Sequence, residues 1–139
     1  MNELHYQKQI IEDVKKSFKN AYAIQMNNRF LAGIPDLLIK VPECDVLFVE
    51  MKVMKWHGSP TIPVETTKLQ RVVMRNMERA GLRVAVWVVL EGENTSVIAR
   101  TSWCSTSITI DPQLLVRRQP GKRWPILQMV TDATGIVKY

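Results

Sequence analysis

The sequence predicts a single α/β domain in which a mixed sheet is flanked by helices. Two stretches repeat apolar side chains with the period of an amphipathic helix, one near the N-terminus and one at residues 67–80. Two short β-prone runs, at 37–41 and 46–53, are joined by only four residues and match a hairpin. A further run, at 82–90, is nearly all apolar and β-branched, as expected of a strand buried on both faces.

Composition sets broad limits on the function. The chain has 139 residues, of which 46% are hydrophobic, and this is enough to bury the core of one domain. No run approaches the roughly 20 apolar residues of a membrane span, and no signal-peptide pattern is present, so we expect a cytoplasmic location. Cys44 and Cys104 lack C-x-x-C spacing and predict neither a zinc site nor a disulfide framework. The net charge of +6 favours an anionic partner, most simply nucleic acid.

The N-terminal elements are a helix and a strand. Residues 1–20 are expected to form the helix, with Glu3 in the first turn, where the helix dipole favours an acidic side chain. Glu3 either stabilises the helix in this way or reaches a functional site from the helix start. A strand is expected at 21–25, followed by a polar turn at 27–29. Arg29 in this turn is a candidate phosphate contact, although such residues are more often turn formers.

The predicted hairpin brings charged side chains together at one end of the sheet. Asp36 precedes the first strand, and Glu50 and Lys52 point to the same face of the second strand because side chains alternate. Folding the hairpin can place Asp36 beside Glu50 and Lys52. Two adjacent carboxylates are costly to assemble unless a divalent metal lies between them. The alternative is a turn-forming Asp36 with an exposed Glu50–Lys52 pair, but the apolar neighbours of this pair indicate a strand covered on both faces.

An irregular loop is expected after the hairpin, at residues 54–65. A long loop next to a carboxylate-bearing strand is usually functional or mobile. Lys55 is a candidate nucleic-acid contact in this loop. Its neighbour Trp56 either stacks on a base or anchors the loop to the core.

The second helix begins with a capping-box sequence. Thr67 and Gln70 have the spacing in which each side chain bonds to the other's backbone amide, and Gly81 ends the helix. Arg71 opens a row of arginines spaced every four residues. Such a row either binds phosphates or forms a solvated helix face.

The composition changes after residue 91. We therefore expect residues 1–91 to form the core and residues 92–139 to form a β-rich C-terminal extension packed on the same domain. Short strands are expected in this extension at 96–100, 106–110 and 126–130. Arg117 and Arg118 begin a basic-aromatic patch that also includes Trp124. The patch either binds the backbone of a nucleic acid or forms an exposed hairpin with Trp124 packed inward.

The predicted elements and the charged cluster resemble the PD-(D/E)xK nuclease superfamily, which has a restriction-endonuclease-like αβββαβ core. Within the superfamily, the chain is most similar to the VRR-NUC (virus-type replication-repair nuclease) family. The resemblance covers about residues 1–91. The matching segments are Glu3-x-x-x-Gln7, Gly33-Ile34-Pro35-Asp36-Leu37, Val49-Glu50-Met51-Lys52, the helix with Gln70, and the strand at 83–86.

The resemblance implies a metal-dependent phosphodiester hydrolase. Asp36 and Glu50, with the backbone carbonyl of Met51, would hold Mg²⁺, for which Mn²⁺ could substitute. Lys52 would orient the attacking water or stabilise the developing charge. Gln70 would hold Lys52 or the attacked phosphate. The residues implied in catalysis are Asp36, Glu50, Lys52, Gln70 and Glu3.

The resemblance also suggests a substrate. Relatives include nucleases that act on four-way junctions, flaps or other branched DNA, and small stand-alone members tend to be viral, which would place the chain in a host cytoplasm. We therefore expect a structure-selective DNA endonuclease that works as a homodimer, because two sites on a two-fold axis can cut paired strands. The alternatives are a DNA-binding module that does not cut and a restriction-like endonuclease of linear duplex DNA.

Overall fold

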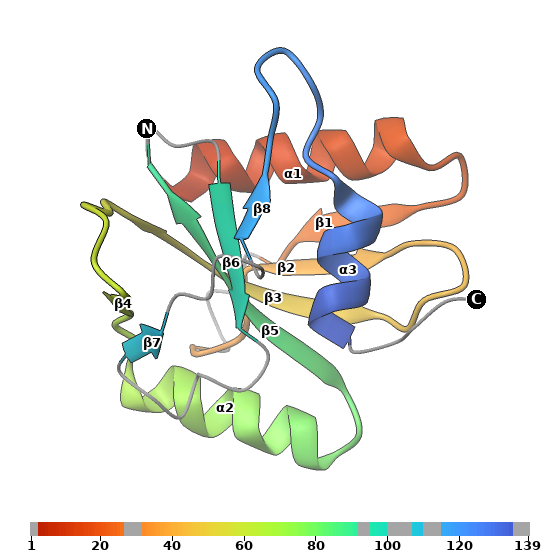
Figure 1. Ribbon diagram of the computed structural model, residues 1–139. Coiled ribbons are helices and arrows are strands. Elements are labelled where there is room, and N and C mark those ends of the chain that lie inside the picture. Colours follow the sequence, from red (N-terminus) through yellow and green to blue (C-terminus); the bar gives the residue numbers. More distant parts are fainter. Residues whose placement is uncertain (1–2, 27–31, 92–94, 100–106, 110–114, 135–139) are drawn as a thin grey trace.

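The computed structural model describes residues 3–26, 32–91, 95–99, 107–109 and 115–134. A six-stranded mixed sheet lies between helices on its two faces (Figure 1). Within the described ranges, no helix is long and apolar enough to cross a membrane. In chain order the elements are α1 (Glu3–Ser17), β1 (Tyr22–Gln25), β2 (Leu37–Lys40), β3 (Leu47–Met54), β4 (Thr61–Pro63), α2 (Lys68–Arg79), β5 (Arg83–Leu90), β6 (Thr95–Ala99), β7 (Ser107–Thr109), β8 (Leu115–Arg117) and α3 (Ile126–Thr134).

The strand order of the sheet is β1-β2-β3-β5-β6-β8. The predicted hairpin is present as the antiparallel pair β2 and β3, in which Leu37 lies opposite Val49. Strands β3 and β5 are parallel, because the chain crosses between them through α2, and the other pairs are antiparallel. Strands β4 and β7 form a separate two-stranded sheet, so part of the stretch expected to be irregular is a strand.

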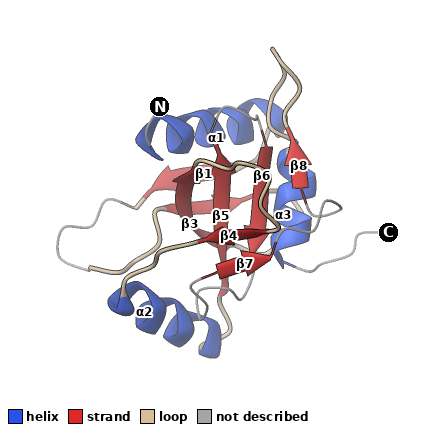
Figure 2. Ribbon diagram, turned by 60° about the vertical axis from the view of Figure 1, so that its left-hand side comes forward, coloured by secondary structure: helices blue, strands red, loops and turns tan. Residues whose placement is uncertain are grey.

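The sheet divides the core into two layers, each covered by helices, as Figure 2 shows. Residues of α1 and α3 pack on one face of the sheet, around Ile10, Trp87 and Met129. Met74 of α2 packs on the other face with β5. The β5 side chains from Val84 to Leu90 are all buried, as predicted for a strand covered on both faces.

One strand prediction in the C-terminal extension is wrong. Residues 126–130 lie in the helix α3, not in a strand. Ile126, Met129, Val130 and Ala133 are buried on one side of it, at the i, i+3, i+4 and i+7 spacing of an amphipathic helix. The β-branched residues in a short apolar run resemble a strand, and the helical period becomes visible only when the run is extended to Ala133. The strand expected at 96–100 is β6, which begins one residue earlier, and the strand expected at 106–110 is the shorter β7.

A close contact holds the loop before β2 against the start of α2. Gly33 has a φ of +87°, a backbone conformation that side chains other than glycine rarely adopt. A Cβ atom at this position would lie 3.0 Å from the Leu69 Cγ and 3.1 Å from the Leu69 carbonyl oxygen. Only glycine therefore fits here without displacing the helix. The contact fixes the loop that carries Asp36 relative to the helix that carries Gln70.

Candidate active site

The Asp36 side chain continues the hydrogen bonding of the sheet beyond the end of β2. Strand β2 pairs with β3 from Leu47 to Val49, so the backbone of Met51 extends past it. The Met51 amide donates to Asp36 Oδ2 at 2.9 Å. The Asp36 carbonyl accepts from the Met26 amide at 2.7 Å, which ties this residue to the end of β1 as well. Asp36 is therefore fixed by backbone contacts from both neighbouring strands.

Glu50 is a buried carboxyl group with two neighbouring donors. The residue is only 3% exposed. Its Oε1 accepts from the Gln70 Nε2 at 3.0 Å and lies 3.6 Å from the Lys52 Nζ. The other oxygen, Oε2, is buried and has no hydrogen-bond partner within the described residues. An unpaired carboxylate oxygen is costly in such a place, so this atom is available to a proton or a cation.

Burial makes both carboxyl groups of this pair harder to ionise. Burial raises the pKa of Glu50 to about 8, with a further increase from the charge of Asp36 and an opposing effect from Lys52. Burial also raises the pKa of Asp36, although its bond from the Met51 amide and the Lys52 ammonium oppose this shift. At neutral pH the metal-free pair therefore retains a proton on Glu50. A divalent cation between the carboxyl groups would displace that proton and remove the repulsion.

The N-termini of α2 and α1 place Gln70 and Glu3 beside the charged cluster of Asp36, Glu50 and Lys52. Gln70 closes the predicted capping box at the start of α2, where its Oε1 accepts from the Thr67 amide at 2.9 Å. Because its Nε2 also donates to Glu50, one side chain serves both the helix cap and the cluster. The bond from Gln70 to Lys52 that the resemblance implied as one possibility is not present in the described part of the chain; the amide holds Glu50 instead.

Glu3 lies at the first turn of α1, close to the same charges. Partial burial raises the pKa of its carboxyl group, the Lys52 ammonium opposes the shift, and Asp36 adds to it. The Val53 backbone also hydrogen-bonds the Glu3 carboxylate. Of the two roles considered for Glu3, this geometry favours the one in which the side chain reaches the cluster from the helix start.

A pair of amides behind the cluster was missed as site residues from the sequence. Gln7 of α1 is 8% exposed, and its Oε1 accepts from the Gln25 Nε2 at 3.1 Å. Gln25 ends β1 opposite Leu37, directly after Asp36. This pair links α1 to the strand that supports Asp36. The sequence contained two signals for it: Gln7 belongs to the Glu3-x-x-x-Gln7 segment of the resemblance, and it lies on the same helix face as the buried Ile10 and Val14.

The predicted nucleic-acid contacts have different surroundings. Lys55 and Arg117 are exposed. Arg71 donates to the carbonyl and hydroxyl oxygens of Thr66, so part of its guanidinium group is used to hold the start of α2. Arg29 lies outside the described residues.

Both tryptophans considered as part of a nucleic-acid interface are turned to the protein. The Trp56 indole donates to the Ser59 carbonyl at 2.7 Å, and its ring packs against the α2 side of the core. Trp124 is 2% exposed, with its indole bonded to Gln9 Oε1 at 2.9 Å. Each therefore follows the alternative in which the ring packs inward.

The possible metal ligands of the cluster are few. Within the described ranges, no group of three His, Cys, Asp or Glu side chains is arranged to hold a metal ion. The cluster instead offers the adjacent carboxylates of Asp36 and Glu50, one of which has an unpaired oxygen. Mg²⁺ is commonly bound through one or two carboxylates and retains several water molecules, so this small set suits a hard cation that also contacts substrate.

Comparisons with known proteins identify a solved structure with a similar fold. No protein-family model matches the chain, and no curated protein sequence matches it. Among solved structures, the chain is similar to Hjc, a Holliday junction resolvase from the archaeal hyperthermophile Archaeoglobus fulgidus. The match has a TM-score of 0.51 and 14% sequence identity, and it covers 79% of this chain and 87% of that chain. The similarity confirms the predicted restriction-endonuclease-like α/β fold. The resemblance to the VRR-NUC family stays a prediction.

Proposed function

We propose that this chain is a divalent-metal-dependent endonuclease of the PD-(D/E)xK superfamily that hydrolyses phosphodiester bonds in branched DNA. The observation that carries the proposal is the buried Glu50 next to the half-buried Asp36, with Lys52 beside them, at one end of the sheet. The shared fold with an archaeal Holliday junction resolvase supports this function and favours a four-way junction as the substrate. The net charge of +6 suits a polyanionic partner.

The geometry around Met51 supports a third oxygen ligand. The Met51 amide points to the edge of β3 that faces Asp36. The amide and carbonyl of one strand residue point to the same edge, so the Met51 carbonyl also faces the region beyond the end of β2. Asp36, Glu50 and this carbonyl would hold Mg²⁺, with Mn²⁺ as a substitute, and leave the other positions to water and substrate.

The residues of the cluster have separate tasks in the proposed reaction. A bound cation supplies positive charge at the phosphate and makes a nearby water more acidic. The Lys52 ammonium, held near Glu50, orients the attacking water and stabilises negative charge that develops on the phosphate. Gln70 keeps Glu50 in place through its amide. Glu3 closes the cluster from α1 and helps to orient the water.

Basic side chains around the cluster would bind the DNA backbone. The candidates are Arg29, Lys55, Arg71, Arg117 and Arg118. Phosphate contacts of this kind position a nucleic acid without reading its sequence, which fits selection by structure. A homodimer would place two active sites on a two-fold axis, as needed to cut both paired strands of a junction.

The test compares a labelled four-way junction with a linear duplex of matched sequence, in Mg²⁺, Mn²⁺ or EDTA. We expect metal-dependent cutting of the junction that is lost in Asp36→Ala, with DNA binding retained. Symmetric nicks on opposite strands would support the dimer. Cutting of the linear duplex alone would indicate a restriction-like enzyme, and binding without cutting in any metal would indicate a DNA-binding module on a nuclease fold.

A further inference from the structure

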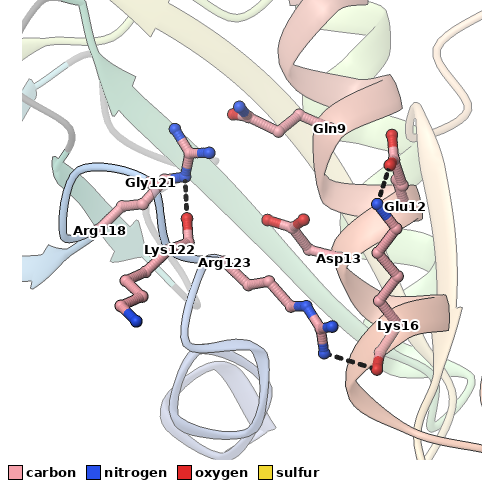
Figure 3. Close-up of a pocket in the computed structure, with 8 residues that line it drawn as sticks. All are labelled: Gln9, Glu12, Asp13, Lys16, Arg118, Gly121, Lys122 and Arg123. Atoms are coloured by element: carbon pink, nitrogen blue, oxygen red, sulfur yellow. Dashed lines mark hydrogen bonds and ion pairs between the residues drawn. The ribbon is translucent and has the colours of Figure 1, made fainter.

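A second polar site lies away from the candidate active site, between α1 and the connection from β8 to α3. It is a cavity of about 320 Å³ that is open to solvent. Figure 3 shows α1 on one side of it and the connecting loop on the other. The lining residues are Gln9, Glu12, Asp13 and Lys16 from α1, and Arg118, Gly121, Lys122 and Arg123 from the loop. We refer to this site as the basic pocket.

The loop is fixed to α1 by hydrogen bonds, so the backbone that carries its cations is held in place before a ligand arrives. Asp13 is 7% exposed, and its Oδ2 accepts from the Trp124 amide at 2.9 Å. The Trp124 indole bonds to Gln9, and the Arg123 guanidinium donates to the Lys16 carbonyl at 2.7 Å. The three α1 positions lie on one helix face, at i, i+4 and i+7. A site preorganised in this way loses little conformational entropy on binding.

The charge of the basic pocket favours an anion. Four cationic and two acidic side chains line it. Both acidic groups already have partners, since Glu12 pairs with Lys16 and Asp13 accepts from the Trp124 backbone. Among the described residues, the Lys122 side chain has no hydrogen bond or ion pair, and it extends from the loop in Figure 3. Arg118 uses its Nε on the Lys122 carbonyl at 2.7 Å, so its terminal nitrogens can still donate.

The position of the basic pocket relative to the carboxylates indicates what it binds. Glu3, which lies beside the carboxylate cluster, and Lys16 are thirteen residues apart on α1, and a helix rises 1.5 Å per residue, so they are about 20 Å apart. Burial raises the pKa of Tyr6, one turn from Glu3; the charge of Glu91 adds to this shift and the charge of Arg118 opposes it. Arg118, which lines the basic pocket, is therefore close enough to act on the helix turn that follows Glu3.

We propose that the basic pocket binds a backbone phosphate of the DNA substrate, at a point up to about 20 Å from the scissile bond. The inference rests on the proposed function and adds to it a specific anchoring site, built jointly by α1 and the C-terminal extension. Arg118 and Lys122 supply the free donors. Arg123 and Trp124 hold the loop in place, and Arg118 and Lys122 bind the phosphate.

The test measures binding to the junction without metal, in EDTA, over a series of salt concentrations. Each phosphate neutralised contributes about 0.9 to the slope of log Kd against log salt. We expect the double variant Arg118→Gln/Lys122→Ala to lose about one unit of slope relative to wild type. The introduced glutamine side chain retains a donor for the loop. The variant Lys122→Ala alone, which removes no hydrogen bond within the described residues, should also reduce the slope, and thermal melting verifies that both variants are folded.

The matched control removes two exposed lysines of α1 that do not line the basic pocket, in the variant Lys8→Gln/Lys15→Ala. We expect this control to keep the wild-type slope. An unchanged slope in the pocket variants would overturn the proposal, and so would an equal loss in the control. Cleavage by wild type in Mg²⁺ is measured on the same junction. Absence of cleavage would contradict the proposed nuclease, whereas cleavage with an unchanged slope in the pocket variants would contradict only the phosphate site.

Discussion

The substitution Glu50→Gln should stabilise the metal-free protein at high pH. The pKa of Glu50 is about 8 in the folded protein and 4.5 in the unfolded chain. Its folded-state pKa is raised, so the stability it contributes is complete below pH 4.5 and is lost as the pH rises toward 8. One pKa unit corresponds to about 1.36 kcal/mol, so wild type should lose about 3 kcal/mol from this group between pH 5 and 8. Glutamine cannot ionise and should not show this loss.

The assay is urea denaturation in EDTA at pH 5, 6, 7 and 8, followed by tryptophan fluorescence. The difference in unfolding free energy between Glu50→Gln and wild type should grow by about 3 kcal/mol across this range in favour of the variant. Titrating groups that Glu50 does not influence cancel in this difference because both proteins contain them. The matched control is Glu78→Gln, an exposed carboxylate on α2, for which we expect no growing difference. A difference that stays constant, or one that increasingly favours wild type, would refute the assignment of Glu50 as a buried group protonated at neutral pH.

Adding Mg²⁺ should reverse the order of the two proteins at pH 8. A cation that binds only the folded state stabilises it by RT ln(1 + [Mg²⁺]/Kd). Wild type should gain this stabilisation, since the cation replaces the proton on Glu50. Glu50→Gln, which has lost one carboxylate, should gain much less. If Mg²⁺ stabilises both proteins equally, Glu50 is not part of the metal site.

Three further substitutions test other parts of the structure. Lys52→Ala should slow single-turnover cleavage on the order of 100- to 1000-fold, with Mg²⁺ affinity retained in calorimetry. Loss of metal affinity would contradict its role on the water and phosphate. Gly33→Ala should lower the unfolding free energy by at least about 1–2 kcal/mol, because alanine is strained at positive φ and its Cβ would press on Leu69. Unchanged stability in urea would show that the loop relaxes. Trp124→Phe should cost about 1 kcal/mol by removing the indole bond to Gln9, and an unaltered melting curve would exclude that contribution.

Apart from β4, the order of elements through β5 could be predicted from the sequence because each signal is local. The hairpin of β2 and β3, the capping box of α2 and the buried strand β5 each depend on neighbouring residues. The extension was harder to predict. Its helix α3 begins with β-branched and apolar residues in a run too short to show a period, and packing against α1 and β5 stabilises the helical form.

The site shows a different limit of sequence reasoning. Asp36, Glu50 and Lys52 are adjacent because a hairpin and side-chain alternation place them so, and these rules are visible in the sequence. The bond from Gln70 to Glu50 depends on where α2 lies over the sheet. No local pattern indicates it, because the capping box already gives Gln70 a complete role.

The contact of Gly33 with α2 explains why Gln70 can both cap α2 and hydrogen-bond to Glu50. A side chain at position 33 would separate the loop before β2 from α2, and the distance between them would then be less well defined. With glycine at this position, the loop backbone approaches Leu69 directly, next to Gln70. The same contact therefore sets the spacing between Asp36, which follows the loop, and the amide that bonds to Glu50. The positive-φ glycine is then part of the geometry of the carboxylate pair, although it carries no chemical group, and Gly33→Ala should impair cleavage even where the fold survives.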